Sequence, residues 1–346
     1  MILKEGKVVF EGQISGKGKG PGKIEGVFYN PAMQLCRDLN VYLFNKINFQ
    51  GHMLDAMAAT GIRGLRIAKE CNVEVDFCDK NPEAIKSITK NLKLNKLKAN
   101  VFRENVLALL HQRRYDMVDI DPFGSPAPYV LAAINGLRNG GILAVTATDT
   151  GALCGTYQKA CLRRYNAINR KSISSKEFAL RILIGFTARQ AAILDRGIEV
   201  LLGYYEGHHF RAYLKLHKGA SKADTSLEMV KYISTDFKII NNPTIDSYGP
   251  MWIGQIADEE CLPDVNQDNR VLYKLINTLK SECKGPLGLQ DLVVLAQEAK
   301  INMPKRDSVI NVLKSKGFFA SQSIFSPLAV RTDASKSDCL DAVSNA

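Results

Sequence analysis

Apolar runs of strand length alternate with amphipathic stretches of helical length between about residues 53 and 150. Strands are predicted at 52–58, 73–79, 99–103, 115–121 and 141–148, with helices at 62–70, from 82 onward, at 106–112 and after Pro126. The helix after residue 80 opens with Asn81-Pro82, which places an N-cap residue before a proline in the first turn. Because each strand leads into a helix, the pattern predicts a parallel sheet with helices on both faces.

The alternation changes after residue 170. A helical pattern at 174–197 leads into two strand-like runs within 197–216, joined by a short turn at Glu206-Gly207. Strands joined by so tight a turn must be antiparallel. A doubly wound sheet that ends in an antiparallel hairpin resembles the plan of class I S-adenosylmethionine-dependent methyltransferases, so we expect an α/β fold with this Rossmann-like sheet.

A second unit is predicted after residue 220. The small and polar stretch 217–226 is interpreted as a linker, which gives a first domain at 1–220 and an α+β domain at 221–346. Helices at 291–300 and 304–317, with a possible wing at 318–332, leave open a winged-helix module or a generic capping domain.

The first domain begins with a basic N-terminal extension, 1–25. Its glycine- and lysine-rich part, 15–23, has neither a strand before it nor a helix after it. We therefore interpret it as a mobile basic loop and not as a phosphate-binding loop.

Composition restricts the class of protein further. No apolar run approaches the roughly 18 residues of a membrane span, and the N-terminus lacks the apolar segment of a signal peptide. The eight cysteines include no C-x-x-C pair, so we expect reduced thiols, no metal site and a cytoplasmic protein. The formal net charge of +11 indicates a polyanionic partner.

The positive charge is concentrated in two segments. Between Tyr157 and Arg189 eight bases stand against one acid, Glu177. A second group lies on and just after the helix that begins at Pro82 and consists of Lys86, Lys90, Lys93, Lys96 and Lys98. Solvated lysine-rich faces are the alternative interpretation, and it is weaker for the arginine-rich first segment.

A cofactor site is predicted where the first of these strands ends. The segment LDAMAATGIRG places Asp55 at the strand end and then turns through Gly61 and Gly64 into a helix. Glycines in such a turn allow backbone amides to approach a ligand. The second strand ends in Asp79, 24 residues beyond Asp55, near where a nucleotide-binding sheet places an acid for ribose hydroxyls.

The loop favours S-adenosylmethionine over NAD. A full G-x-G-x-x-G is missing, whereas Arg63 lies in the loop and Arg37 upstream of it. An arginine fork can bind the carboxylate of a methionine moiety through paired hydrogen bonds. Asn105, after the third strand, is placed to read the adenine edge or, alternatively, to cap a helix.

The fourth strand ends in Asp121-Pro122-Phe123, at the edge of the sheet where ligands bind. An exocyclic amine on a base is a poor nucleophile because its lone pair is delocalised into the ring. Asp121 and the Pro122 carbonyl could accept its hydrogens and offset the developing positive charge, and Phe123 could stack on the base. The alternative is a strand followed by a proline turn with a core phenylalanine.

Several stretches together resemble the tRNA (guanine-26-N2)-dimethyltransferase family. They are FYNPAMQLCRDL (28–39), LDAMAATGIRGLR (54–66), DIDPFGSP (119–126) and VTATDTGALCG (145–155), supported by 181–192, 204–216 and 248–254. They cover most of residues 24–255 in the order of the family, and the C-terminal part matches only loosely.

The resemblance implies dimethylation of the N2 amine of a guanine in tRNA with two S-adenosylmethionine molecules. It assigns cofactor binding to residues matched by motif: Arg37, Arg63, Asp79, Asn105 and Val106. Some relatives have an acid at the position of Asn105, and the zinc-binding cysteines of certain relatives are absent here.

For the base, the resemblance implies Asp121 as the catalytic acid, with Phe28 and Phe123 clamping a guanine that has swung out of its helix. Arg163, Arg164 and the neighbouring bases would bind tRNA phosphates without reading sequence. The predicted tRNA-binding residues are Arg163, Arg164, Arg170 and Lys171. We expect a monomer that uses no metal.

Three alternatives stay open. A DNA or ribosomal-RNA amino-methyltransferase could share the Asp-Pro-Phe segment, although the block at 28–39 favours tRNA. An RNA-binding protein could keep the pocket without turnover, against which Asp79 and Asp121 argue. An NAD oxidoreductase is the most distant alternative.

Overall fold

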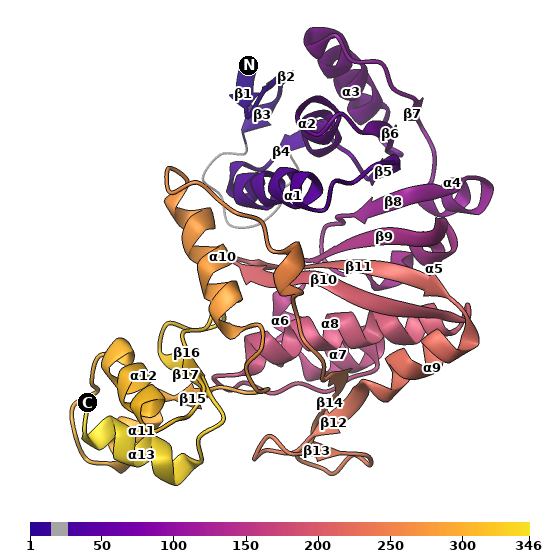
Figure 1. Ribbon diagram of the computed structural model, residues 1–346. Helices are drawn as coiled ribbons and strands as arrows, with labels where there is room; N and C mark the ends of the chain where they lie inside the picture. The colour runs from indigo at the N-terminus through magenta and orange to yellow at the C-terminus, as the bar shows by residue number, and fades with distance from the viewer. Residues whose placement is uncertain (15–26) are drawn as a thin grey trace.

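A seven-stranded sheet forms the centre of the molecule (Figure 1). The computed structural model describes residues 1–14 and 27–346. The strand order is β10-β11-β9-β8-β5-β6-β7. The strands are β5 (His52–Ala56), β6 (Glu74–Cys78), β7 (Val101–Phe102), β8 (Tyr115–Ile120), β9 (Leu137–Ala147), β10 (Arg196–Glu206) and β11 (His209–Lys218).

The last hairpin distinguishes this sheet from an all-parallel one. β11 is antiparallel to both of its neighbours, β9 and β10, and the other adjacent strands are parallel. Glu206 pairs with His209, so only two residues form the turn between β10 and β11. The predicted class I methyltransferase plan with its final antiparallel hairpin is confirmed.

Helices cover both faces of the sheet, as the sequence predicts (Figure 1). Each face has its own apolar core. One core includes residues of α4 (Val106–Gln112), α5 (Ala127–Asn135) and α8 (Ser175–Ala192). The other includes residues of α1 (Gln34–Lys46), which follows the 3-10 turn η1 (Pro31–Met33), and of α2 (Ile62–Glu70) and α3 (Pro82–Asn95).

β9 begins four residues earlier than its apolar run indicates. The pairing of β8 with β9 shifts register between Tyr115 and Met117. Gly140 has a φ of +76°, and a Cβ on Gly141 would lie only 3.0 Å from the carbonyl oxygen of Asp116. The two glycines therefore belong to an irregular strand and not to the loop before it.

The linker predicted at 217–226 is wrong, because α9 (Ala220–Glu228) occupies this segment. Its small residues allow close contact with β10, and the Ser226 hydroxyl accepts a 2.9 Å hydrogen bond from the Ile198 amide. A small sheet follows, with β12 (Val230–Ile233), β13 (Ile239–Ile240) and β14 (Tyr248–Trp252). Side chains of this sheet belong to the same core as α8, so the first structural unit extends beyond residue 220.

The C-terminal module, residues 290–346, has a separate apolar core. After η2 (Glu259–Cys261) and α10 (Arg270–Glu282) come β15 (Gln290–Asp291), α11 (Leu292–Glu298), α12 (Arg306–Ser315), β16 (Ala320–Ser321), β17 (Ala329–Thr332) and α13 (Lys336–Ser344). The helices expected at 291–300 and 304–317 are therefore present. The strand order β15-β17-β16 and the preceding helices agree with what a winged-helix module requires, and that assignment stays a prediction.

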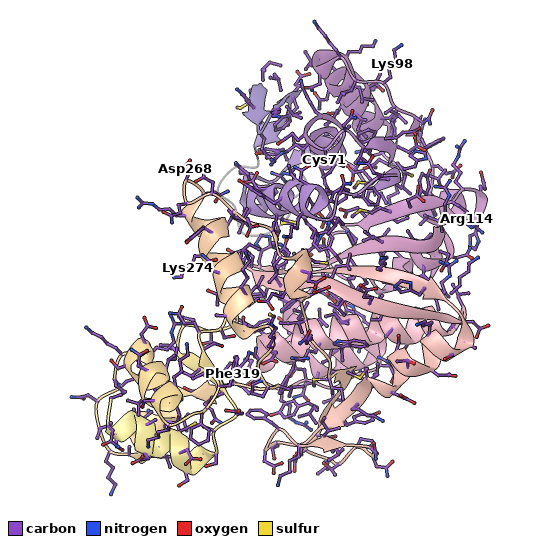
Figure 2. The ribbon with its side chains drawn as sticks, in the orientation of Figure 1. Cys71, Lys98, Arg114, Asp268, Lys274 and Phe319 are labelled. Carbon is purple, nitrogen blue, oxygen red and sulfur yellow. The ribbon has the colours of Figure 1, made fainter. Side chains whose placement is uncertain are left out.

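Buried ion pairs connect this module to α8. Arg331 of β17, which is 1% exposed, donates to Glu177 of α8 and to Glu282 of α10, both at 2.9 Å. Arg181 donates to the same oxygen of Glu177 at 2.8 Å. Phe319 lies at this junction in Figure 2, where a Cβ on Gly285 would meet its ring. The module is thus attached to the first unit through desolvated charges.

The N-terminal hairpin of β1 (Ile2–Glu5) and β2 (Val8–Glu11) packs beside α3. Asn91 and Asn95, one turn apart on α3, exchange hydrogen bonds with the backbone of β2 as a neighbouring strand would. β3 (Gln13–Ile14) then pairs in parallel with β4 (Phe28–Tyr29). The basic loop predicted at 15–23 and the end of the extension lie outside the described residues.

Within the described part of the chain, every helix is too short or too polar to span a lipid bilayer. The same residues contain no group of three or more histidine, cysteine or acidic side chains arranged to bind a metal ion.

Candidate active site

Three predicted aspartates lie at one edge of the sheet. Asp55 is near the end of β5, Asp79 follows β6, and Asp121 follows β8. β5 pairs with β6 on one side and β8 on the other, so the strand order reverses at β5. An open α/β sheet binds ligands at the carboxyl ends of strands beside such a reversal.

The loop after β5 has an unusual backbone. Met57, Ala59 and Gly61 have φ values of +61°, +50° and +76°. Left-handed backbone is costly for Met57 and Ala59, and such residues cluster at ligand sites. Left-handed backbone is expected from the sequence at Gly61, whereas no sequence signal indicates it at Met57 or Ala59.

Asp79 holds this loop in place. Its Oδ2 accepts a hydrogen bond from the Ala59 amide at 3.0 Å, and its Oδ1 accepts one from the Asn81 amide at 2.8 Å. Each carboxylate oxygen can accept a further hydrogen bond. Asp79 is therefore oriented by backbone and can still bind a pair of hydroxyl groups.

Asn105 caps α4, the alternative role that the sequence left open. Its side chain accepts a 3.0 Å hydrogen bond from the Leu107 amide, while the side chain itself stays exposed. Val106, the first residue of α4, is buried. The contact of both residues with adenine stays a prediction.

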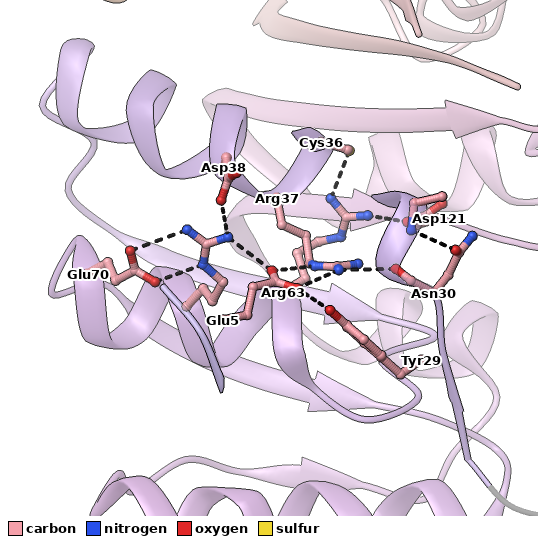
Figure 3. Close-up of polar contacts among 11 residues, drawn as sticks. Glu5, Tyr29, Asn30, Cys36, Arg37, Asp38, Arg63, Glu70 and Asp121 are labelled. Carbon is pink, nitrogen blue, oxygen red and sulfur yellow. Dashed lines mark hydrogen bonds and ion pairs between the residues drawn. The ribbon is translucent and has the colours of Figure 1, made fainter. Parts of the chain in front are cut away.

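Arg63 of α2 contacts both Cys36 and Asp121 (Figure 3). Its Nη2 donates to Oδ2 of Asp121, and its Nη1 donates to the Cys36 sulfur at 3.4 Å. Its Nε lies 3.8 Å from Asp119. Burial alone would lower the pKa of Arg63, but Asp119, Cys36 and Asp121 outweigh it and raise that pKa well above its ordinary value. Arg63 is permanently charged at this position.

A second buried arginine forms an ion pair with Asp119, which lies beside Arg63. Arg211 of β11 is fully buried and donates to both oxygens of Asp119 and to the Thr146 hydroxyl. Burial would raise the pKa of Asp119, but Arg211 and Arg63 keep it lowered. The stretch 204–216 is predicted as a strand and supports the family resemblance, but no role is predicted for Arg211. A base at an inward position between apolar residues was the signal for this buried ion pair.

Arg37, predicted to bind the cofactor, is paired with a residue that the sequence did not single out. Its Nε and Nη2 donate to the two oxygens of Glu5 at 2.7 and 2.6 Å (Figure 3). Glu5 also accepts from Tyr29 and Arg66. Although burial raises the pKa of Glu5, Arg37, Tyr29 and Arg66 together lower it. A ligand would therefore have to contact Arg37 through Nη1.

Asp55 is buried beneath the loop and accepts a 2.8 Å hydrogen bond from the Gly64 amide. Burial and the nearby Asp119 raise its pKa to about 7. A Cβ on Gly64 would lie 2.9 Å from the Asp55 carboxylate and closer still to the Phe77 ring. Glycine at 64 thus allows α2 to start directly over the end of β5.

The Asp-Pro-Phe segment presents an aromatic ring to solvent. Pro122 is buried, whereas Phe123 is 70% exposed, so the alternative of a core phenylalanine is wrong. The Gly124 amide donates to the Thr148 hydroxyl at 2.7 Å, and the Thr148 amide donates to the Gly124 carbonyl at 3.0 Å. Phe28 lies in β4, and its side chain is outside what the structure describes.

A chain of hydroxyl groups fixes the same loop from the other side. Ser125 donates to the Tyr165 hydroxyl at 2.8 Å, and Tyr165 donates to Asp149 at 2.7 Å. Asp149 precedes α6 (Thr150–Leu153), and Tyr165 ends α7 (Gln158–Tyr165). The stretch 145–155, quoted above for its resemblance, therefore anchors the loop that carries Asp121.

The predicted tRNA-binding residues differ in their surroundings. Arg163 and Lys171 are exposed. Arg164 is also exposed but donates to Asp149 at 3.0 Å. Arg170 donates to the carbonyls of Ser247 and Ile245, so part of its function is to hold that loop.

The eight bases between 157 and 189 do not form one surface. Arg181 is buried against Glu177, and Arg189 donates to the Tyr165 carbonyl. The five lysines on and after α3 are all exposed, although Lys86 and Lys90 pair with Glu83 and Glu11. Counting bases in the sequence therefore overestimates the positive charge that the segment 157–189 offers to a ligand.

Comparison with known proteins gives one consistent result. A family model described as N2,N2-dimethylguanosine tRNA methyltransferase matches residues 13–344. A tRNA (guanine(26)-N(2))-dimethyltransferase from Methanocaldococcus jannaschii is 38% identical over 99% of this chain and 98% of its own length. One from Pyrococcus abyssi is 37% identical over 89% and 90%. The structure of Trm1 from Pyrococcus horikoshii in complex with S-adenosyl-L-methionine superposes with a TM-score of 0.90, with 32% identity and 99% coverage of both chains.

Proposed function

The chain belongs to the N2,N2-dimethylguanosine tRNA methyltransferase family, and from this premise we propose that it dimethylates the N2 amine of guanine 26 in tRNA. Similar proteins carry that activity in their names, and the solved relative binds S-adenosylmethionine. The observation that carries the proposal is the position of Asp121. Its carboxylate follows β8, next to the strand-order reversal, beside a buried proline and an exposed phenylalanine.

The residues around the reversal fit S-adenosylmethionine. The left-handed loop at 57–61 brings backbone close to the ligand space, and Asp79 retains acceptor capacity for the ribose hydroxyls. Arg63 and Arg37 supply fixed positive charge for the methionine carboxylate, and Asn105 with Val106 would face the adenine. When bound, this cofactor supplies an electrophilic methyl group on a sulfonium centre.

Asp121 orients the nucleophile in this proposal. It accepts one hydrogen of the guanine amine, and the Pro122 carbonyl accepts the other. These bonds turn the nitrogen lone pair out of conjugation and offset the charge that develops on nitrogen. Proline fixes φ at its own position, which helps to hold the carbonyl in place.

Phe123 and Phe28 hold the base in this scheme. A guanine at the junction of two tRNA arms must leave its stack to reach a strand-end pocket, at a cost of a few kcal/mol. Stacking on an aromatic ring recovers about 1–3 kcal/mol per base. With 70% of its surface exposed, Phe123 presents a ring to an incoming base.

A second transfer to the same nitrogen is compatible with this arrangement. The monomethylated amine keeps one hydrogen, which Asp121 can still accept, and the first methyl group then turns toward the Pro122 carbonyl. Two molecules of S-adenosylmethionine are consumed for each guanine. Each transfer releases S-adenosylhomocysteine and one proton.

Recognition of tRNA rests on phosphates and shape. Arg163 and Lys171 are exposed near the anchored loop, and Arg164 shares its charge with Asp149. Such contacts position a polyanion without reading its sequence. The C-terminal module, held by Arg331, provides a second contact at a fixed distance.

The test is nucleoside mass spectrometry of a tRNA transcript incubated with the protein and isotope-labelled S-adenosylmethionine. We expect labelled N2,N2-dimethylguanosine from the wild-type transcript and none from a transcript with adenosine at position 26. Labelled monomethylguanosine alone would contradict the second transfer. Labelling of ribosomal RNA or DNA in preference to tRNA would contradict the substrate, and failure to label any of the three would contradict the activity.

A further inference from the structure

An exposed tyrosine stands beside the anchored loop, and the mechanism above does not use it. Tyr157, which precedes α7, is 66% exposed. Together with residues 155–160 and Arg163 it lines a surface hollow of about 540 Å³. A tyrosine ring exposed to water lacks the stabilisation that burial would give it, so an exposed ring beside a surface hollow is a candidate contact for a ligand.

The position of Tyr157 is fixed. Its amide donates to the Gly151 carbonyl at 2.9 Å, and a Cβ on Gly151 would lie 2.8 Å from its ring. Gly155, with a φ of +83°, packs against the backbone of Arg170. The ring therefore packs against Gly151, where a larger residue would displace it, and this contact restricts the side chain before a ligand binds.

The charges around the hollow favour a nucleic acid. Lys159 and Arg163 are exposed on α7, and residues 156–163 contain no acid. A flat aromatic ring with cations beside it is the combination that binds unpaired nucleotides, because every base has a face for stacking and every phosphate a charge.

The hollow is close to the catalytic loop. Thr148 is hydrogen-bonded to Gly124, the residue after Phe123, and Gly151 is three residues from Thr148. Tyr157 is hydrogen-bonded to Gly151. The two hydrogen bonds and the three residues of chain from Thr148 to Gly151 therefore keep Gly124 and Tyr157 within about 20 Å of each other. Nucleotides close to the target guanine are within this reach.

We propose that Tyr157 is a second stacking platform, which binds an unpaired tRNA base near the target guanine while Arg163 and Lys159 bind its phosphates. This inference rests on the proposed function. It adds a contact for a base that is not methylated, so the ring acts on tRNA affinity and has no part in cofactor binding.

The experiment measures binding of fluorescently labelled tRNA by anisotropy, without methyl transfer, for wild type, Tyr157→Ala and Tyr157→Phe. The alanine variant should bind roughly 5- to 150-fold more weakly. The phenylalanine variant should bind within about twofold of wild type, since it retains the ring. The matched control is Ile193→Ala: Ile193 is 64% exposed and lies just before β10, at the opposite edge of the sheet.

Salt dependence separates stacking from phosphate contacts. Tyr157→Ala should leave the slope of log affinity against log salt unchanged, whereas Arg163→Gln should make it less negative by about 0.7–0.9. Wild-type affinity in Tyr157→Ala, or equal weakening in the alanine and phenylalanine variants, would overturn the inference.

The same samples distinguish the two proposals. If wild type labels tRNA but Tyr157→Ala binds normally, only the stacking platform is wrong. If tRNA binding depends on the ring but no methyl group is transferred, the activity is wrong and the platform stands. If wild type does not bind tRNA, both are wrong.

Discussion

Arg63 donates a hydrogen bond to Asp121, so a residue predicted to hold the cofactor and the residue predicted to act on the base form one ion pair. Arg63 also contacts Cys36 and lies near Asp119, which forms an ion pair with Arg211. The two halves of the site are therefore coupled through one guanidinium group. The effects on kcat of substituting Arg63 and Asp121 should therefore not add.

The first prediction concerns Asp121→Asn. The variant keeps the shape of the side chain but removes the charge that offsets the developing cation, and we expect kcat to fall by about 10²–10³-fold. Binding of S-adenosylmethionine, measured by calorimetry, should change little. Asp236→Asn, an exposed acid paired with Lys238, is the control. Wild-type turnover in Asp121→Asn would remove this carboxylate from the mechanism.

The second prediction concerns Phe123→Ala. We expect KM for tRNA to rise about 5- to 150-fold, because a stacking face is lost. The free energy of unfolding should stay within about 0.5 kcal/mol of wild type, since 70% of the side chain is exposed. Phe123→Tyr should restore KM. A loss of stability that accounts for the loss of activity would instead indicate a packing role.

The third prediction concerns the pH dependence of stability. The pKa of Asp55 is raised from 3.8 to about 7, so the folded state holds this proton more tightly than the unfolded state does. The stability from this group is present below pH 4 and is lost as the pH rises through 7. Asn at this position accepts the same bond from Gly64 without a charge.

We therefore expect Asp55→Asn to gain stability relative to wild type as the pH rises from 4 to 7, by on the order of 4 kcal/mol, and to hold that gain above pH 7. Urea unfolding at pH 4.5, 6 and 8 measures the difference. Asp236→Asn again provides the control, and a difference that does not change with pH would show that Asp55 titrates normally.

The fourth prediction concerns the buried junction. Arg331→Met removes the partner of Glu282 and one partner of Glu177, and a broken buried pair costs about 3–5 kcal/mol. Burial already raises the pKa of Glu282, so the loss should be larger at pH 8 than at pH 5. Lys336→Met, which breaks an exposed pair with Glu298, should cost less than about 1 kcal/mol. Equal losses in both variants would show that Arg331 is not specifically required.

The sequence was sufficient to predict the elements whose structure depends on residues close together in the chain. The strands and helices between 52 and 148 follow from apolar spacing, and the final hairpin follows from a turn too short for any other connection. The strand ends then bring Asp55, Asp79 and Asp121 to one edge by topology alone.

The features that could not be predicted from the sequence depend on contacts between residues far apart in the chain. Nothing near Asn91 or Asn95 shows that their amides pair with a strand at least 80 residues earlier. The segment 217–226 has the composition of a linker, and only its contact with β10 makes it a helix that packs. Arg181 was counted with the surface bases, although its position four residues after Glu177, on a helix with apolar residues all around, could have indicated burial.

Glu5 has a consequence for any shortened form of this protein. A chain trimmed to begin at the basic loop would keep every residue of the strand-end site and still remove the countercharge that Arg37 and Arg66 share. Two guanidinium groups would then be desolvated without their common acid, and one of them, Arg37, is predicted to bind the cofactor. Shortened forms should therefore be trimmed at the C-terminus. Affinity tags that could displace β1 should also be attached there.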